Sequence, residues 1–142
     1  MKRLRSRVAM LVLISTAFAA ILVASASASR APTASARKAI DNAVLTTHVA
    51  GLNHVPRSHY RVTGERVSTV SSSWAKAEIV ARSGFQSTFQ NAIVVLIRPA
   101  GTQQWVVVDL GSAEVGCGIA PNKVLADLFA TKTPCPPGDG IG

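Results

Sequence analysis

The feature that most constrains the fold is an apolar run at consecutive positions, "NAIVVLIRP", over residues 91–99. Such a run leaves no polar face, so it predicts a strand at the centre of a sheet, ended by its proline. The preceding segment, "WAKAEIVAR" over 74–82, alternates small or apolar residues with charged ones, which is typical of a half-buried antiparallel strand. After the turn residues "RPAGTQQ", the segment "QQWVVVDLG" over 103–111 returns as a hairpin partner. These segments predict an antiparallel meander.

Helical spacing of apolar residues marks two further segments. These are "SARKAIDNAVLTTHVAG" over 35–51 and "APNKVLADLFA" over 120–130, whose proline suits a first helical turn. Weaker strand patterns cover residues 60–63 and 67–71. We therefore expect an α+β fold with an N-terminal helix, an antiparallel meander of three to four strands and a short C-terminal helix. We also expect the helices to cover one face of the sheet.

The N-terminus has the composition of a secretory signal. Basic residues within the first seven positions precede an uncharged apolar run over 8–24, and small Ala and Ser residues follow. This pattern predicts a signal peptide over 1–28, with cleavage after Ala28 or, as an alternative, after Ala26. A retained membrane anchor is a further alternative, because the apolar run nearly reaches the length that spans a bilayer.

The rest of the chain is long enough for one domain and not for two. We expect a disordered lead-in over 29–36, a single α+β domain over 37–135 and a flexible tail over 136–142. Once the signal is removed, no stable membrane span is expected. These features predict a secreted protein that is extracellular or associated with the cell envelope.

The charge is basic, with a formal net charge of +8. Four of the 15 basic residues lie in the predicted signal, which leaves eleven against seven acidic residues. The remaining basic residues are scattered singly along the sequence without interleaved aromatic residues, and nucleic-acid binding needs clusters or stacking platforms. We therefore expect no nucleic-acid partner, although a basic secreted protein can be retained on anionic envelope polymers.

The chain contains two cysteines, Cys117 and Cys135. In an exported protein such a pair predicts a disulfide, here across 18 positions and contributing about 3 kcal/mol by chain-entropy estimates. The alternative is that Cys117 is a nucleophile served by a histidine, which needs a base nearby and a lowered thiol pKa. The sequence places none of the three histidines near it; they are His48, His54 and His59.

Other chemical motifs are incomplete. The segment "GCGIAPNK" has neither the spacing of a Walker loop nor that of a dinucleotide fingerprint. Asp109 and Ser112 follow a strand pattern without a nucleophile elbow, so Asp109 is expected to accept backbone N–H groups of the following turn. His54 and His59 lack a matching carboxylate pair. We therefore predict no cofactor, no metal site and no catalytic residues.

Four aromatic residues are candidates for a ligand or partner surface: Trp74, Trp105, Phe85 and Phe89. The two tryptophans each begin a strand pattern, where an aromatic side chain usually covers the end of a core. The leading functional hypothesis is a non-enzymatic domain that binds an envelope component or a protein through the sheet or its loops. The alternative is a small hydrolase that uses Cys117, or a serine, together with a histidine.

The segments "SSSWAKAEIV" and "IVVLIRPAGTQQWVVVDLGSAEVGCGIAPNKVLADL", with the last cysteine, resemble an uncharacterised group of small secreted actinobacterial proteins. The shared pattern is W-A-x-A, a strand, W-x-V-V-x-x-G-[ST], G-C, a proline, a short helix and a cysteine. The resemblance implies export, the α+β order and the disulfide, and it implies no activity. The matching residues are Trp74, Ala75, Ala77, Trp105, Val107, Val108, Gly111, Ser112, Gly116, Cys117, Pro121 and Cys135.

The order of elements is also similar to the helix-plus-meander layout of cystatins and NTF2-like proteins. Cystatins inhibit through a Q-x-V-x-G hairpin loop, whereas the hairpin here reads "RPAGTQQW". The layout therefore implies a fold and no inhibitory function.

Overall fold

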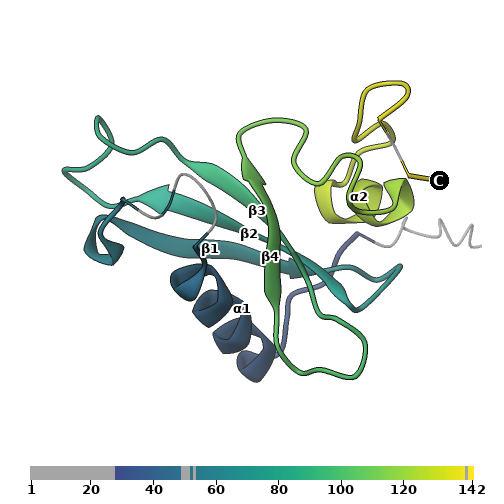
Figure 1. Cartoon of the computed structure of the whole chain (residues 1–142), viewed down its shortest axis with the longest axis horizontal. Coiled ribbons are helices and arrows are strands. Elements are labelled where there is room, and N and C mark those ends of the chain that lie inside the picture. Colours follow the sequence, from purple (N-terminus) through teal and green to yellow (C-terminus); the bar gives the residue numbers. More distant parts are fainter. Residues whose placement is uncertain (1–27, 49–51, 53, 140) are drawn as a thin grey trace, which may run out of the picture.

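The computed structural model describes residues 28–48, 52, 54–139 and 141–142 (Figure 1). The predicted signal peptide therefore lies almost entirely outside the described residues. Within these residues, two helices and four strands follow one another. They are α1 (Ala34–Thr46), β1 (Tyr60–Val67), β2 (Trp74–Ala81), β3 (Ala92–Ile97), β4 (Val106–Gly111) and α2 (Asn122–Phe129), with a 3₁₀ turn, η1 (Arg57–His59), before β1.

The four strands form one antiparallel meander in the order β1-β2-β3-β4, which confirms the predicted α+β class. The strand at residues 67–71 was wrongly predicted, because the chain leaves the sheet after Val67. β1 is instead one strand that continues through Gly64, where two residues oppose Ala77 of β2. Gly64 has a φ of +65°, and this left-handed conformation lets the bulge form without a steric penalty.

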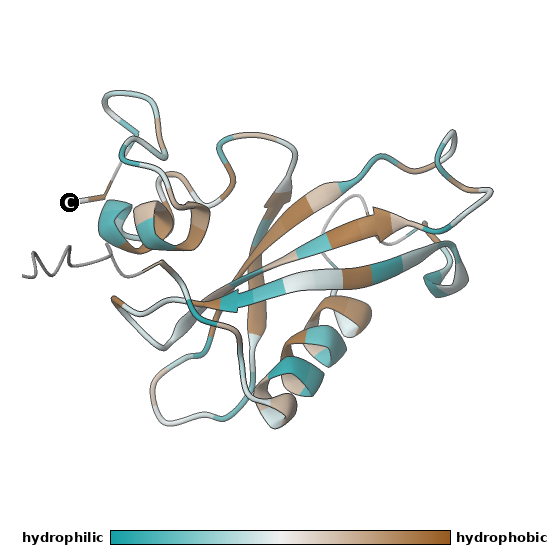
Figure 2. Ribbon diagram, turned by 180° about the vertical axis from the view of Figure 1, so that it is seen from behind, coloured by the Kyte–Doolittle hydropathy of each residue, from teal (hydrophilic) through white to brown (hydrophobic). Residues whose placement is uncertain are grey.

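The helices lie on opposite faces of the sheet, and this corrects the expectation that both cover one face (Figures 1 and 2). Ile40 and Val44 of α1 pack with Val94 and Leu96 of β3. On the other face, the apolar side of α2 packs around Val95. The physical reason is the doubly apolar β3: each of its faces must be covered, and one helix layer leaves the second face in water.

Glycine allows the close contact between the β4–α2 connection and this second core. A Cβ built on Gly116 would lie 2.8 Å from Leu125 Cδ2 and 3.3 Å from Val95 Cγ2. The φ of Gly116 is +87°, a conformation that L side chains rarely adopt. The glycine next to Cys117 is therefore required for packing as well as for the turn from sheet to helix.

The segment before α1 differs from the predicted disordered lead-in. Arg30 exchanges two backbone hydrogen bonds of 2.9 Å with Val67, and Thr33 caps α1 by accepting a hydrogen bond from Ala36 N. Pairing next to the end of β1 satisfies backbone groups that an edge strand would otherwise expose. In the predicted flexible tail, the Ile141 carbonyl accepts a hydrogen bond from Asn122 N at 2.9 Å.

Candidate functional site

Cys117 and Cys135 form the predicted disulfide, with their Cα atoms 5.7 Å apart. Cys117 is therefore not a thiol in this structure and has no nucleophilic sulfur to offer. Of the three histidines, His59 stacks on Phe85 with ring centroids 3.8 Å apart, and His48 and His54 are exposed. Within the described part of the chain, no histidine is hydrogen-bonded to a serine or a carboxylate.

Asp109 acts as an acceptor for backbone groups, as its pattern predicted. Its Oδ1 accepts a hydrogen bond of 2.8 Å from Leu110 N, and its Oδ2 accepts one of 2.6 Å from Gly116 N. Asp109 lies inside β4 rather than at its end, and its bond to Gly116 ties the connecting loop back onto the strand. Ser112 is exposed on that loop.

The four candidate aromatic side chains do not gather on one surface. Trp74 is buried in the core under α2, and Trp105 is buried in the core under α1. Phe85 and Phe89 are half-buried in the β2–β3 loop, where Phe89 stacks on Tyr60 with ring centroids 5.7 Å apart. The positions of both tryptophans agree with the core interpretation of these residues.

Asp127 is a buried acid that the sequence reasoning missed. It lies on α2, and its carboxylate accepts hydrogen bonds from Ser68 Oγ at 2.8 Å, Thr69 N at 2.7 Å and Thr69 Oγ1 at 2.9 Å. Burial alone would raise the pKa of Asp127, but these hydrogen bonds outweigh it and hold the pKa below its ordinary value. Asp127 therefore attaches the β1–β2 loop to α2 as an ionised group.

A second acid, Asp41 on α1, faces Glu65 on β1. Burial, a hydrogen bond with Glu65 and repulsion from its charge raise the pKa of Asp41 to about 6, and the nearby Arg37 only partly offsets this. Arg37 Nε lies 3.6 Å from Glu65 Oε2, and Asp41 Oδ1 is buried without a hydrogen-bond partner. The pair is held together best when one carboxyl group carries a proton.

This pair predicts a pH dependence of stability. Because the folded pKa of Asp41 is raised, the folded state binds the proton more tightly than the unfolded state, whose ordinary pKa is about 3.9. The resulting stabilisation is present below about pH 4 and is lost as the pH rises to about 6. In urea titrations, Asp41→Asn should flatten this decline between pH 4 and 6, whereas Asp139→Asn at an exposed site should not.

A cluster of basic side chains forms only once β1 and β2 pair. Arg66 lies directly opposite Lys76, and Arg61 lies opposite Val80. The side chains of these two pairs therefore lie on the face on which α2 packs. Arg82 follows Val80 by two positions, so it lies on the same face of the sheet. Its backbone N–H donates to the His59 carbonyl and extends the pairing of β1 with β2. We call Arg61, Arg66, Lys76 and Arg82 the basic strip.

The charge of the basic strip is only partly compensated. Lys76 Nζ lies 3.8 Å from Glu78 Oε1, and Arg82 Nε donates to the Tyr60 carbonyl at 2.9 Å. Among the described residues, neither Arg61 nor Arg66 forms an ion pair. Like charges placed opposite each other across two strands are destabilising, so the pair Arg66 and Lys76 would gain from a bound anion. Figure 2 shows the hydrophilic residues at both ends of β1.

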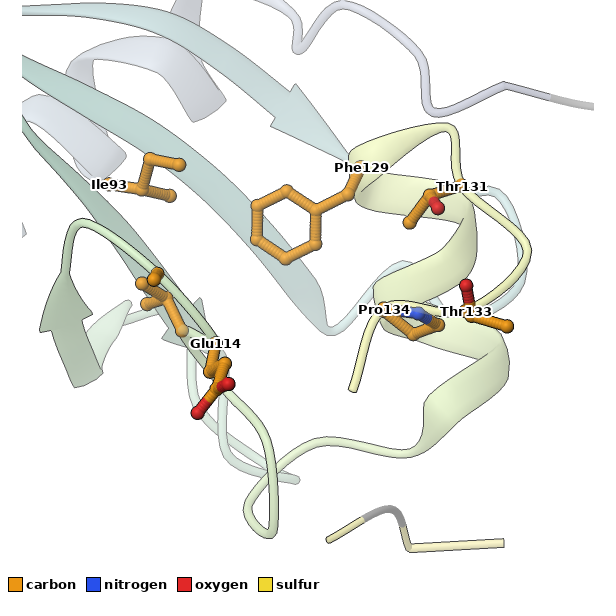
Figure 3. A pocket seen from close by; sticks show the side chains of 8 residues that line it. Ile93, Glu114, Phe129, Thr131, Thr133 and Pro134 are labelled. Atoms are coloured by element: carbon orange, nitrogen blue, oxygen red, sulfur yellow. The ribbon is translucent and has the colours of Figure 1, made fainter. Parts of the chain in front are cut away.

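A hollow lies where α2 meets the sheet (Figure 3). The cavity has a volume of about 180 Å³, and the ring of Phe129 projects from the end of α2 towards Ile93. Lys76 Nζ lies 5.3 Å from the centre of the same ring, which connects the strip with the hollow. The remaining lining residues are Ala113, Glu114, Val115, Thr131, Thr133 and Pro134.

Comparisons with protein families, with curated proteins and with solved structures find no match for this chain. The resemblance to the actinobacterial group therefore stays a prediction. In the described residues, no helix is long and apolar enough to cross a membrane, and no three potential ligand side chains gather as a metal site would require.

Proposed function

We propose that this protein is an exported, non-enzymatic domain that binds an anionic polymer of the cell envelope through the basic strip. The observation that carries the proposal is the cross-strand pair of Arg66 and Lys76, flanked on the same face by Arg61 and Arg82. Positive charges spread over one face of two adjacent strands match a ligand with regularly spaced phosphates, sulfates or carboxylates. Such binding depends on the release of counterions and needs no deep pocket.

Export is supported by the N-terminal pattern of basic, apolar and small residues. The Cys117–Cys135 disulfide is compatible with it, because such bonds persist in oxidising compartments. An exported protein meets envelope polymers in high local concentration, so even modest affinity per charge would retain it there.

The structural roles of the candidate catalytic residues favour binding over hydrolysis. Cys117 is bonded to Cys135, Asp109 accepts two backbone N–H groups, and His59 is stacked on Phe85. The alternative, a small hydrolase, needs a nucleophile and a base in hydrogen-bond contact. The basic strip needs only the side chains that the sheet already aligns.

The test compares two double variants that lose the same net charge. Arg61→Gln with Arg66→Gln removes half of the basic strip, whereas Lys38→Gln with Lys123→Gln removes two exposed charges on the helices. With long-chain polyphosphate as the probe at about 50 mM salt, we expect the strip variant to bind about tenfold or more weakly than wild type. Isothermal titration calorimetry gives the affinities.

The helix variant is the matched control and should bind within about twofold of wild type. An equal loss in both variants would show that only net charge matters, and it would contradict the assignment to the strip. Wild-type protein that does not bind polyphosphate, dextran sulfate or polyglutamate would contradict the proposed function as a whole.

A further inference from the structure

Ser29 directly follows the predicted cleavage position, and its environment is unusual for a residue so near a processing site. It is only 5% exposed, whereas Ala28 beside it is exposed. The nitrogen of Ser29 lies 3.4 Å from the carbonyl oxygen of Asp127, close to the end of α2. A chain that began at Ser29 would therefore place its α-amino group at the end of a helix.

The C-terminal end of α2 is a favourable place for a positive charge. The last carbonyl groups of a helix carry the negative end of its dipole, and cations there stabilise it. Ala130 N and Thr131 N already bond to the carbonyls of Asp127 and Ala126, respectively. The Asp127 side chain is the carboxylate to which Ser68 and Thr69 donate hydrogen bonds. Asp127 therefore contributes its carboxylate charge in addition to the negative end of the helix dipole.

The segment around Ser29 is held to β1 as well as to α2. Arg30, the next residue, is paired with Val67 by two hydrogen bonds, which leaves Ser29 little freedom relative to β1. The β1–β2 loop over 68–73 packs beside α2 and carries no ionisable side chain. The charged residues next to these contacts are Asp127 on α2, Arg30 in the same segment, Arg66 before Val67 on β1, and Lys132 after Thr131.

We propose that the exported chain is cut between Ala28 and Ser29, and that the new α-ammonium group binds the C-terminal end of α2. A signal peptidase that accepts small residues would use water to break this peptide bond. The hydroxyl of the water completes the Ala28 carboxyl group. The Ser29 nitrogen takes the remaining proton of the water and the proton that this carboxyl group releases, which leaves a carboxylate and an ammonium group. Because Ser29 is buried in the folded domain, the cut precedes folding.

Cleavage after Ala26 would not produce this contact. The chain would keep two more residues, and the Ser29 nitrogen would remain an amide with one N–H group and no charge. An ammonium group offers three donors and a positive charge at the same place, so processing after Ala28 stabilises the mature domain directly. This inference depends on export and not on the polymer that the basic strip binds.

The first experiment is to express the full chain in a secreting bacterial host and to measure the intact mass of the exported protein. We expect the mass of residues 29–142 with one disulfide. A chain that begins at Ser27, or an uncut chain, would overturn the assignment. Polymer binding is measured separately, so failure here and failure of the proposed function are distinguishable.

The second experiment shifts the cut with matched variants. Ala28→Leu removes the small residue before the preferred site and should move cleavage to Ala26, whereas Ala24→Leu weakens only the alternative site and should give the wild-type product. At pH 6, the secreted Ala28→Leu protein should melt about 3 °C lower than the Ala24→Leu protein. The difference should vanish near pH 10, where an α-amine is uncharged. Equal melting at pH 6, or a difference that persists at pH 10, would overturn the role of the ammonium group.

Discussion

Removal of the Cys117–Cys135 disulfide by substitution of both cysteines with serine should lower the free energy of unfolding by about 3 kcal/mol. The bond closes a loop of 18 positions that contains the whole of α2. Without it, the unfolded chain gains conformational freedom. The core between α2 and the sheet also loses its covalent link to the C-terminal segment. Small domains are stable by only about 5–15 kcal/mol, so this loss should be easily visible in urea titrations.

The control for the serine substitutions is wild-type protein reduced in mild urea and then alkylated. Both preparations lack the cross-link but differ in the groups at positions 117 and 135, so a common loss identifies the cross-link as its cause. If the serine variant lost less than about 1 kcal/mol, the disulfide would not be the main constraint on α2.

Replacement of Asp127 by alanine should cost about 3 kcal/mol, because it leaves Ser68 and Thr69 without their buried acceptor. Hydrogen bonds to an ionised carboxylate are stronger than neutral ones. Ser68 is fully buried, so its hydroxyl cannot reach water without movement of the loop. Asp139 is exposed, and its change to alanine should alter the free energy of unfolding by less than about 0.5 kcal/mol.

The same carboxylate sets a second pH dependence, opposite in sign to that of Asp41. The folded pKa of Asp127 is lowered, so its stabilisation is present above the ordinary value of about 3.9 and is lost as the pH falls through the lower folded value. Chemical denaturation between pH 2 and 5 should show this acid loss in wild type and a weaker one in Asp127→Asn. If Asp127→Asn lost as much unfolding free energy between pH 5 and 2 as wild type, the role of the ionised carboxylate would be contradicted.

The strands β2, β3 and β4 could be predicted because each shows its burial directly in its own pattern of side chains. Only the first half of β1, over residues 60–63, was predicted, because Gly64 interrupts the alternation and the bulge that joins the two halves depends on pairing with β2. The position of α2 on the second face follows from the doubly apolar β3, but the choice of face requires the three-dimensional connection through Gly116.

The candidate site was less predictable, since its residues lie far apart in the sequence. Arg61 and Lys76 are separated by 15 positions, and only the strand register places them on one face. The helical pattern places Asp127 on the solvent-exposed side of α2, but the β1–β2 loop covers it in the fold. By contrast, the disulfide depends on the only two cysteines in the chain, so composition alone identified it.

The salt dependence of polymer binding tests the central claim most directly. For a flexible polyanion, the logarithm of the affinity falls with the logarithm of the salt concentration by about 0.7 for each charge contact, so four contacts predict a slope of about −3. Arg61→Gln with Arg66→Gln should reduce this slope to about half, while Lys38→Gln with Lys123→Gln should leave it unchanged. If the slopes of the two variants are equal, or if wild-type binding does not respond to salt, the basic strip is not the binding surface.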